Sequence, residues 1–215
     1  MRAQQSHILL NRQAHNNTCR DLIDSMSFLR FKTPHAWTQT VLEDFDTFLQ
    51  DHAAAEKKAS GMAVSMLSHY PDRIELVKAM TDLALEEMSH FKEVIKIIYA
   101  RGKILGDDQK DPYINDFRKA YRRGTDEYLI DRLLIAGIIE ARGCERFALV
   151  GEALEAGPMK AFYQAIAESE GRHHELFINL AELYFPKEII AQRLDELLNI
   201  EANIVEGLPL RAALH

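Results

Sequence analysis

Two stretches of this sequence place a glutamate and a histidine, three residues apart, inside an apolar helical stripe. Glu87 and His90 follow Leu83 at spacings of four and three residues, so the three side chains share one face of a helix. Glu170 and His173 stand in a second stripe in the same way. Because the apolar face of a helix packs into the core, these ionisable groups must meet a partner of opposite charge when the chain folds.

Two other apolar stripes each contain a single glutamate, and their positions turn the pattern into a repeat. Glu56 precedes Glu87 by 31 residues, and Glu140 precedes Glu170 by 30. Since a helix rises about 1.5 Å per residue, an antiparallel hairpin brings the single glutamate and the Glu-x-x-His motif of each half to a similar depth. Two such hairpins packed together gather six side chains, which we predict to be the catalytic and metal-binding residues: Glu56, Glu87, His90, Glu140, Glu170 and His173.

Helical periodicity extends through nearly the whole sequence, and no segment shows the alternation typical of a strand. We predict an all-α protein with one domain over residues 1–215, in which a four-helix bundle of about residues 35–184 carries additional N- and C-terminal helices. Asp72 is expected to cap the second long helix. The expected long helices cover about 34–70, 72–101, 125–157, 158–184 and 187–207, with a loop over 102–116, a short basic helix over 117–124 and short helices within the first 30 residues.

The composition excludes several other classes of protein. The formal net charge of −7 argues against a surface that binds nucleic acid or anionic lipid everywhere, although it permits a local basic patch. Cys19 and Cys144 are too few for a disulfide framework or a zinc ribbon. No run of about 18 apolar residues and no signal-peptide core is present, which predicts a soluble, cytoplasmic protein without a membrane span.

Four carboxylates gathered in a core need positive charge beside them. Ionised side chains in a low-dielectric interior bind cations, take up protons or prevent folding. The nearest arginines, Arg142, Arg146 and Arg172, face away from the stripes by helical phase, whereas two divalent metal ions would balance the four negative charges. Carboxylate and imidazole without thiolate favour iron or manganese over structural zinc, and four-helix bundles hold dinuclear sites of this composition.

Four sequence stretches carry a resemblance to a known family. The predicted ligand set resembles that of the ferritin-like di-iron carboxylate proteins. Within that superfamily, the stretches DHAAAEKKAS, LEEMSHF, IIEARGCERF and ESEGRHHELF are similar to the bacterial tRNA hydroxylases that act on 2-methylthio-isopentenyl-adenosine. The resemblance implies a ferritin-like bundle with two iron ions, dioxygen as co-substrate, and hydroxylation of the isopentenyl chain of the modified adenosine beside the anticodon.

The resemblance also implies a role for each predicted ligand. Glu87 and Glu170 would bridge the two irons, Glu56 and Glu140 would each bind one iron terminally, and His90 and His173 would each complete one iron. Two electrons would come from an external reductase, because the sequence has no flavin, nicotinamide, haem or iron–sulfur motif. His52, one turn before Glu56, fits either a side chain that orients a ligand or a hydrogen-bonded core histidine.

The densest basic cluster lies between the two predicted hairpins. Its cations could hold phosphates of the tRNA anticodon loop, and its tyrosine could stack on a base. An ordinary solvated helix is the competing interpretation. A base that reacts at a buried metal would also have to leave the loop and enter a pocket, which the sequence does not locate. The predicted RNA-binding residues are Arg118, Lys119, Tyr121, Arg122 and Arg123.

Three other interpretations use the same features. A ferroxidase or iron-storage protein would have the same ligands, but the insert over residues 102–125 fits poorly with the cage that such proteins form. A rubrerythrin-like peroxidase or a manganese catalase is the second, although the former usually carries a cysteine-rich iron domain that this chain lacks. A metal-free helical interaction module is the third, and the buried charges disfavour it.

Overall fold

The computed structural model describes residues 18–215, and every regular element within them is helical. The predicted all-α class is therefore confirmed. None of these helices is long and apolar enough to cross a bilayer. The elements are α1 (Cys19–Ser25), α2 (His35–Glu43), α3 (Phe45–His69), α4 (Ile74–Ala100), α5 (Pro112–Phe117), the 3₁₀ turn η1 (Arg118–Ala120), α6 (Thr125–Ala153), α7 (Pro158–Tyr184) and α8 (Lys187–Gly207).

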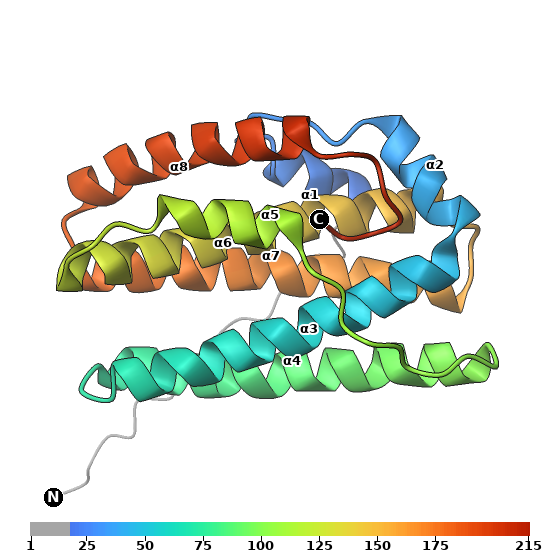
Figure 1. Ribbon diagram of the computed structural model, residues 1–215, viewed down its shortest axis with the longest axis horizontal. Coiled ribbons are helices and arrows are strands. Elements are labelled where there is room, and N and C mark those ends of the chain that lie inside the picture. The colour runs from blue at the N-terminus through green and yellow to red at the C-terminus, as the bar shows by residue number, and fades with distance from the viewer. Residues whose placement is uncertain (1–17) are drawn as a thin grey trace, which may run out of the picture.

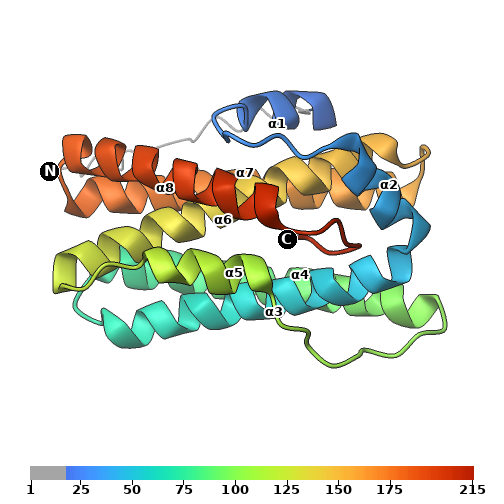
Figure 2. The same cartoon turned by 45° about the horizontal axis from the view of Figure 1, so that its top comes forward.

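Four long helices form the bundle as two hairpins. Helix α3 packs along α4, and α6 packs along α7, while α4 and α7 meet across the middle (Figure 1). The additional helices cover the second hairpin: α1 packs on α6 and α7, and α8 lies over them with α5 beside it (Figure 2). The expected four-helix bundle with additional N- and C-terminal helices is confirmed.

Helix α6 is the central helix of the molecule. Between Leu129 and Gly151 every residue is buried except Ile139 and Leu149. A helix that contacts neighbours on all sides has no solvated face, so its charged residues must find partners inside the protein. This position lets α6 contribute both to the predicted metal site and to the packing of the outer helices.

The expected first helix of residues 34–70 is wrong in one respect, because it is two helices. Asp44 separates α2 from α3, with backbone angles φ −130° and ψ 59° that are not helical. Its side chain accepts a hydrogen bond from the Thr47 N–H (3.3 Å) and so caps the new helix. Apolar periodicity continues on both sides of the break, so the pattern did not reveal it.

The segment between the hairpins also differs from the prediction. The expected loop over 102–116 contains α5, which Asp111 caps by accepting from the Ile114 N–H, with Pro112 at the first helical position. The expected basic helix over 117–124 is wrong, since Phe117 ends α5 and only the three-residue turn η1 is helical after it. Before α5, residues 102–111 pass across α3 (Figure 1), where the Gln50 side chain donates to the Ile104 carbonyl.

Two helix ends differ from expectation as well. Helix α6 ends at Ala153 rather than near Gly157, and α4 begins at Ile74 without a side-chain cap from Asp72. At the N-terminal side, Thr18 and Asp21 form a capping box for α1, one of the short helices expected in the first 30 residues. The remainder of that expectation falls on residues 1–17, outside the described residues.

Candidate metal centre

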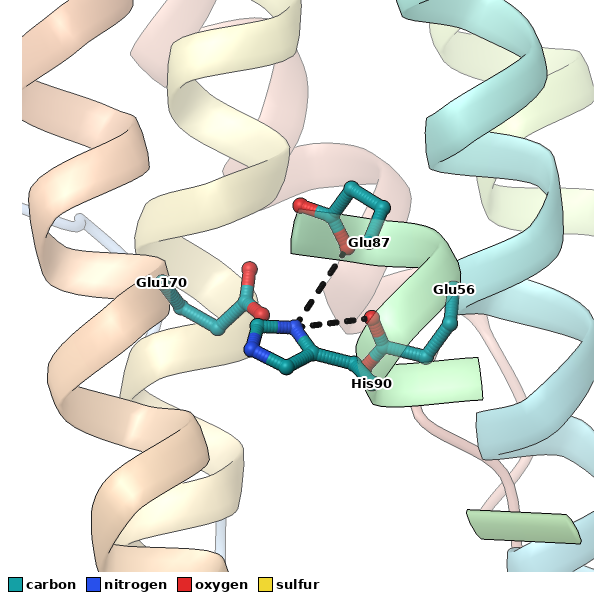
Figure 3. A group of neighbouring side chains, drawn as sticks. All are labelled: Glu56, Glu87, His90 and Glu170. Atoms are coloured by element: carbon teal, nitrogen blue, oxygen red, sulfur yellow. Dashed lines mark ion pairs between the residues drawn. The ribbon is translucent and has the colours of Figure 1, made fainter. Parts of the chain in front are cut away.

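The six predicted ligands come from the four bundle helices and meet between the two hairpins. Their ligand atoms form two groups, within each of which every atom lies within 4.8 Å of the others. Glu87 and Glu170 belong to both groups. The first group is Glu56, Glu87, His90 and Glu170 (Figure 3), and the second is Glu87, Glu140, Glu170 and His173.

Both histidines turn the same ring nitrogen, Nδ1, toward the carboxylates. His90 Nδ1 lies 3.4 Å from Glu56 Oε2 and 3.8 Å from Glu87 Oε2, the two contacts drawn in Figure 3. His173 Nδ1 lies 2.9 Å from Glu87 Oε1 and 3.7 Å from Glu170 Oε2. Each Glu-x-x-His motif therefore presents one nitrogen and one carboxylate to the same point.

The hydrogen-bonding capacity of this cluster is incompletely used. All four glutamates are at most 5% exposed. Four buried atoms of the cluster have no hydrogen-bond partner within residues 18–215: Glu56 Oε2, Glu87 Oε1, His90 Nδ1 and His173 Nδ1. Buried polar atoms are normally satisfied, so orphans concentrated at one point indicate a missing group. Oxygen and imidazole ligands at this spacing fit a pair of divalent metal ions.

The protonation of the cluster reflects its crowding. Burial, with the neighbouring carboxylates, raises the pKa of Glu56 and of Glu140 well above the ordinary value. Burial would lower the pKa of His90, but the contacts with Glu56 and Glu87 raise it to about 10. Without metal, protons therefore supply the positive charge that the carboxylates need. Divalent cations would replace those protons, since a metal ligand must be deprotonated.

His52 contacts a predicted ligand and also belongs to the aromatic core. Its Nε2 lies 2.7 Å from Glu56 Oε1, and its Nδ1 lies 3.3 Å from the Tyr163 hydroxyl. Burial lowers the pKa of His52 to about 3, so the ring is neutral. When Glu56 is ionised as a ligand, Nε2–H donates to it and Nδ1 accepts from Tyr163. Of the two interpretations of His52, this contact favours orientation of a ligand.

Glu86 is a functional candidate that the sequence analysis missed. Its Oε2 lies 3.3 Å from His173 Nε2, the nitrogen that faces away from the cluster, while Ser169 and Arg172 donate to its Oε1 at 2.6 and 2.9 Å. The contact with His173 lowers the pKa of Glu86 to about 2. A carboxylate behind a ligating histidine fixes the ring orientation. Its position beside Glu87 in sequence gave no sign of this role.

A cavity of about 730 Å³ extends beside the cluster between α3, α5 and α6. Its volume lies in the usual range for small-ligand sites. The four predicted carboxylate ligands line it together with small and apolar side chains. Basic and aromatic residues line other parts of it, among them Lys58, Lys110, Arg118, Tyr121, Tyr128 and Arg132.

The five predicted RNA-binding residues have different environments. Arg118 and Tyr121 line the cavity. Arg122 makes a two-pronged ion pair with the buried Asp131, so its guanidinium already has a partner. Lys119 is exposed and pairs with Asp116, and Arg123 is exposed. These placements leave the contact with RNA a prediction and make Arg118 and Tyr121 its best-positioned members.

A four-helix bundle that holds carboxylate and histidine groups between its hairpins is the arrangement of ferritin-like metalloproteins. The fold is shared with a solved structure, protein 43 with aldehyde deformylating oxygenase activity from Synechococcus. The two agree with a TM-score of 0.82 and 34% identity, over 87% of this chain and 94% of that one.

The chain belongs to the tRNA-(MS[2]IO[6]A)-hydroxylase (MiaE) family, whose model matches residues 20–215. It is 32% identical over 181 residues to the tRNA 2-(methylsulfanyl)-N(6)-isopentenyladenosine(37) hydroxylase of Pseudomonas putida. The aligned residues cover 84% of this chain and 88% of the relative. The enzyme of the same name from Salmonella typhimurium is 31% identical over 142 residues, 66% of this chain and 52% of the relative. The family resemblance inferred from the sequence is confirmed.

Proposed function

We propose that this protein hydroxylates the isopentenyl side chain of 2-methylthio-isopentenyl-adenosine next to the anticodon of tRNA. The observation that carries the proposal is the pair of ligand groups that share Glu87 and Glu170 and lie beside a cavity, in a chain of this hydroxylase family. The relatives from Pseudomonas and Salmonella bear the name of that reaction.

The proposed cofactor is a pair of iron ions with dioxygen as co-substrate. Glu87 and Glu170 would bridge the irons, because each belongs to both groups. Glu56 and His90 would complete the ligands of one iron, and Glu140 and His173 those of the other. The buried atoms without a hydrogen-bond partner on Glu56, Glu87, His90 and His173 support these roles. When bound, the iron pair supplies the activation of dioxygen that insertion of an oxygen atom into an unreactive C–H bond requires.

The protein's own residues would hold and orient this centre. His52 would position Glu56, and Glu86 would position His173 through the ring nitrogen opposite the metal. The aromatic rings of Phe48, Phe147 and Tyr163 pack around His52 and keep water from that side of the cluster. The site is thus built on rigid bundle helices rather than on loops.

The cavity provides a route for the substrate. A modified base must be extruded from the anticodon loop to reach a buried centre. Apolar side chains of the cavity, including Met62, Ile135 and Ile139, suit an isopentenyl chain, and the basic residues suit the phosphates of RNA. The proposal includes an external reductase that supplies two electrons and a cytoplasmic location where tRNA is found.

The experiment that tests the function compares nucleosides of tRNA from cells with and without an active copy of the gene. Mass spectrometry should find the hydroxylated nucleoside only with the active copy, and purified iron-loaded protein with a chemical reductant should convert unhydroxylated tRNA. Unchanged nucleosides in both assays would refute the proposal. Iron loading far above two per chain would indicate storage, and rapid peroxide turnover without tRNA would indicate a peroxidase.

A further inference from the structure

Arg132 is a buried arginine without an anionic partner. Four arginines of residues 18–215 are at most 8% exposed: Arg132, Arg142, Arg146 and Arg193. Arg142 and Arg193 each bind two carboxylates, and Arg146 donates to the Leu214 carbonyl. Within the described residues no carboxylate lies within 4.0 Å of the Arg132 guanidinium, which donates to Ser65 Oγ at 3.3 Å and also interacts with the Tyr70 hydroxyl. Arg146 likewise has no carboxylate within 4.0 Å among the described residues, but of the four buried arginines Arg132 alone lines the cavity beside the cluster. An uncompensated buried charge is costly, and at this position a ligand in the cavity would supply the counter-charge.

The surroundings of Arg132 resemble a prepared anion site. The guanidinium lies close to two aromatic rings, 6.0 Å from the ring centroid of Tyr70 and 5.9 Å from that of Tyr128. Tyr121 packs edge-on against Tyr128 with centroids 5.4 Å apart. The two neighbouring rings restrict the guanidinium, and its five N–H donors exceed the partners that Ser65 and Tyr70 provide. Arg132, Tyr121 and Tyr128 all line the cavity that contains the carboxylate cluster.

The position of Arg132 relative to the cluster is fixed by one helix. Arg132, Ala136 and Glu140 follow one another at four-residue spacing on α6, and all three line the cavity. Arg132 and Glu140 are eight residues apart on this helix, so their backbone positions are separated by about 12 Å along the helix axis. The cavity therefore has a reactive centre at one point and an unpaired cation about two helical turns away.

We propose that Arg132 binds a phosphodiester of the substrate nucleotide. This inference rests on the proposed function and adds the point at which the substrate is held. A purine nucleotide with an N6-alkyl chain has its apolar tail at one end and its phosphate at the other. With the tail at the predicted metal site, the phosphate would lie toward Arg132. Arginine is suited to the task, because its planar fork matches two phosphate oxygens. The exposed Lys58, Lys110 and Arg118 would contact phosphates further along the strand.

The test compares two substrates that differ in phosphate. One is a modified anticodon stem-loop, and the other is the free modified nucleoside. Arg132→Gln should lower kcat/KM for the stem-loop about tenfold and leave the nucleoside unchanged. Arg132→Lys should restore part of the loss, and Arg20→Gln, at an exposed position on α1, should leave both substrates as in the wild type. The slope of log Kd for the stem-loop against log salt should fall by about 0.7 in Arg132→Gln.

The outcomes separate this subsite from the proposed function. Equal losses for both substrates, or an unchanged salt slope, would overturn the role of Arg132. If the wild type converts neither substrate, the proposed function fails, and stem-loop binding with its salt slope alone decides on the subsite. The melting temperature identifies a variant that unfolds. Because the Arg132 guanidinium has no carboxylate partner in the wild type, Arg132→Gln should melt at a temperature no lower than the wild type. A lower melting temperature with unchanged stem-loop binding would assign Arg132 to structure and overturn the inference.

Discussion

Glu87 shows at the scale of one residue why the candidate metal centre needs positive charge. It is 1% exposed and belongs to both ligand groups. Burial alone would raise its pKa, yet the contacts with His173 and His90 outweigh burial and lower it. An ionised carboxylate at the centre of a core persists only with cations around it, and in the metal-free protein these are the two imidazolium rings. If metal ions replaced those protons, their positive charge would still balance the negative charge of the carboxylates.

The shared position of Glu170 predicts the effect of its replacement. Glu170→Gln removes a carboxylate that both metal ions would share, so bound iron should fall from about two per chain to well below one. The metal-free variant should unfold at a temperature no lower than metal-free wild type, because one of four crowded carboxylates is gone. Metal analysis and thermal unfolding measure the two effects.

Glu175 provides the matched control. It lies on the same helix, five residues beyond Glu170, but is exposed. Glu175→Gln should retain the iron of the wild type. Wild-type iron content in Glu170→Gln would show that Glu170 is not a ligand.

At the scale of the elements, the start of a helix depends on which residue can cap it. Asp44 and Asp72 both precede long helices and both suit the N-cap position by residue type. Asp44 caps α3, whereas α4 starts after Arg73 with no side-chain cap. The break at Asp44 lets α2 leave the bundle axis (Figure 2), where Trp37 donates to the Ala213 carbonyl in the C-terminal segment.

The difference between the two aspartates can be measured. Asp44→Ala removes the cap of α3 and should lower the free energy of unfolding by about 1 kcal/mol. Asp72→Ala, the matched change, should alter it by less than about 0.5 kcal/mol, as surface substitutions without a partner do. Urea unfolding curves followed by circular dichroism would give both values, and equal effects would contradict the assigned caps.

At the scale of the whole molecule, a buried polar network joins the outer helices to the bundle. Arg142 on α6 donates to both carboxylate oxygens of Glu201 on α8, at 2.8 and 3.0 Å, and Tyr113 on α5 approaches the same carboxylate at 3.3 Å. Tyr113 also stacks on His215, with centroids 4.6 Å apart. His215 lines the cavity, so this network fixes one wall of the proposed substrate route.

Replacement of Arg142 should have a large effect on stability. Arg142→Met leaves two buried carboxylates without their cation and should cost about 3–5 kcal/mol in the free energy of unfolding. Arg20→Gln, which breaks an exposed pair with Asp24, should cost less than about 1 kcal/mol. Chemical unfolding of both variants would test this, and a small effect of Arg142→Met would mean that the network is not needed for stability.

The six candidate ligands could be found from the sequence, because a helical stripe is a local property. Residues at spacings of three and four share a face whatever surrounds the helix, so Glu87 with His90 and Glu170 with His173 were visible as pairs. The repeat spacing then placed the single glutamates at matching depth. Most of the long helices and their hairpin pairing followed from the same periodicity and from the prolines and glycines at the breaks, whereas the break at Asp44 and the helix α5 did not.

The partners of the remaining polar groups were decided by tertiary structure. The sequence offers several aspartates and glutamates to every arginine, and only packing selects Asp131 for Arg122 while leaving Arg132 without a carboxylate. Glu86 behind His173 likewise depends on where α4 and α7 meet. Hydrogen bonds and ion pairs act over a few ångströms between segments far apart in the chain, so they form only once the helices are placed. The periodic sequence thus determined which faces are buried, and the packing of those faces determined which charges are paired and which remain free for a substrate.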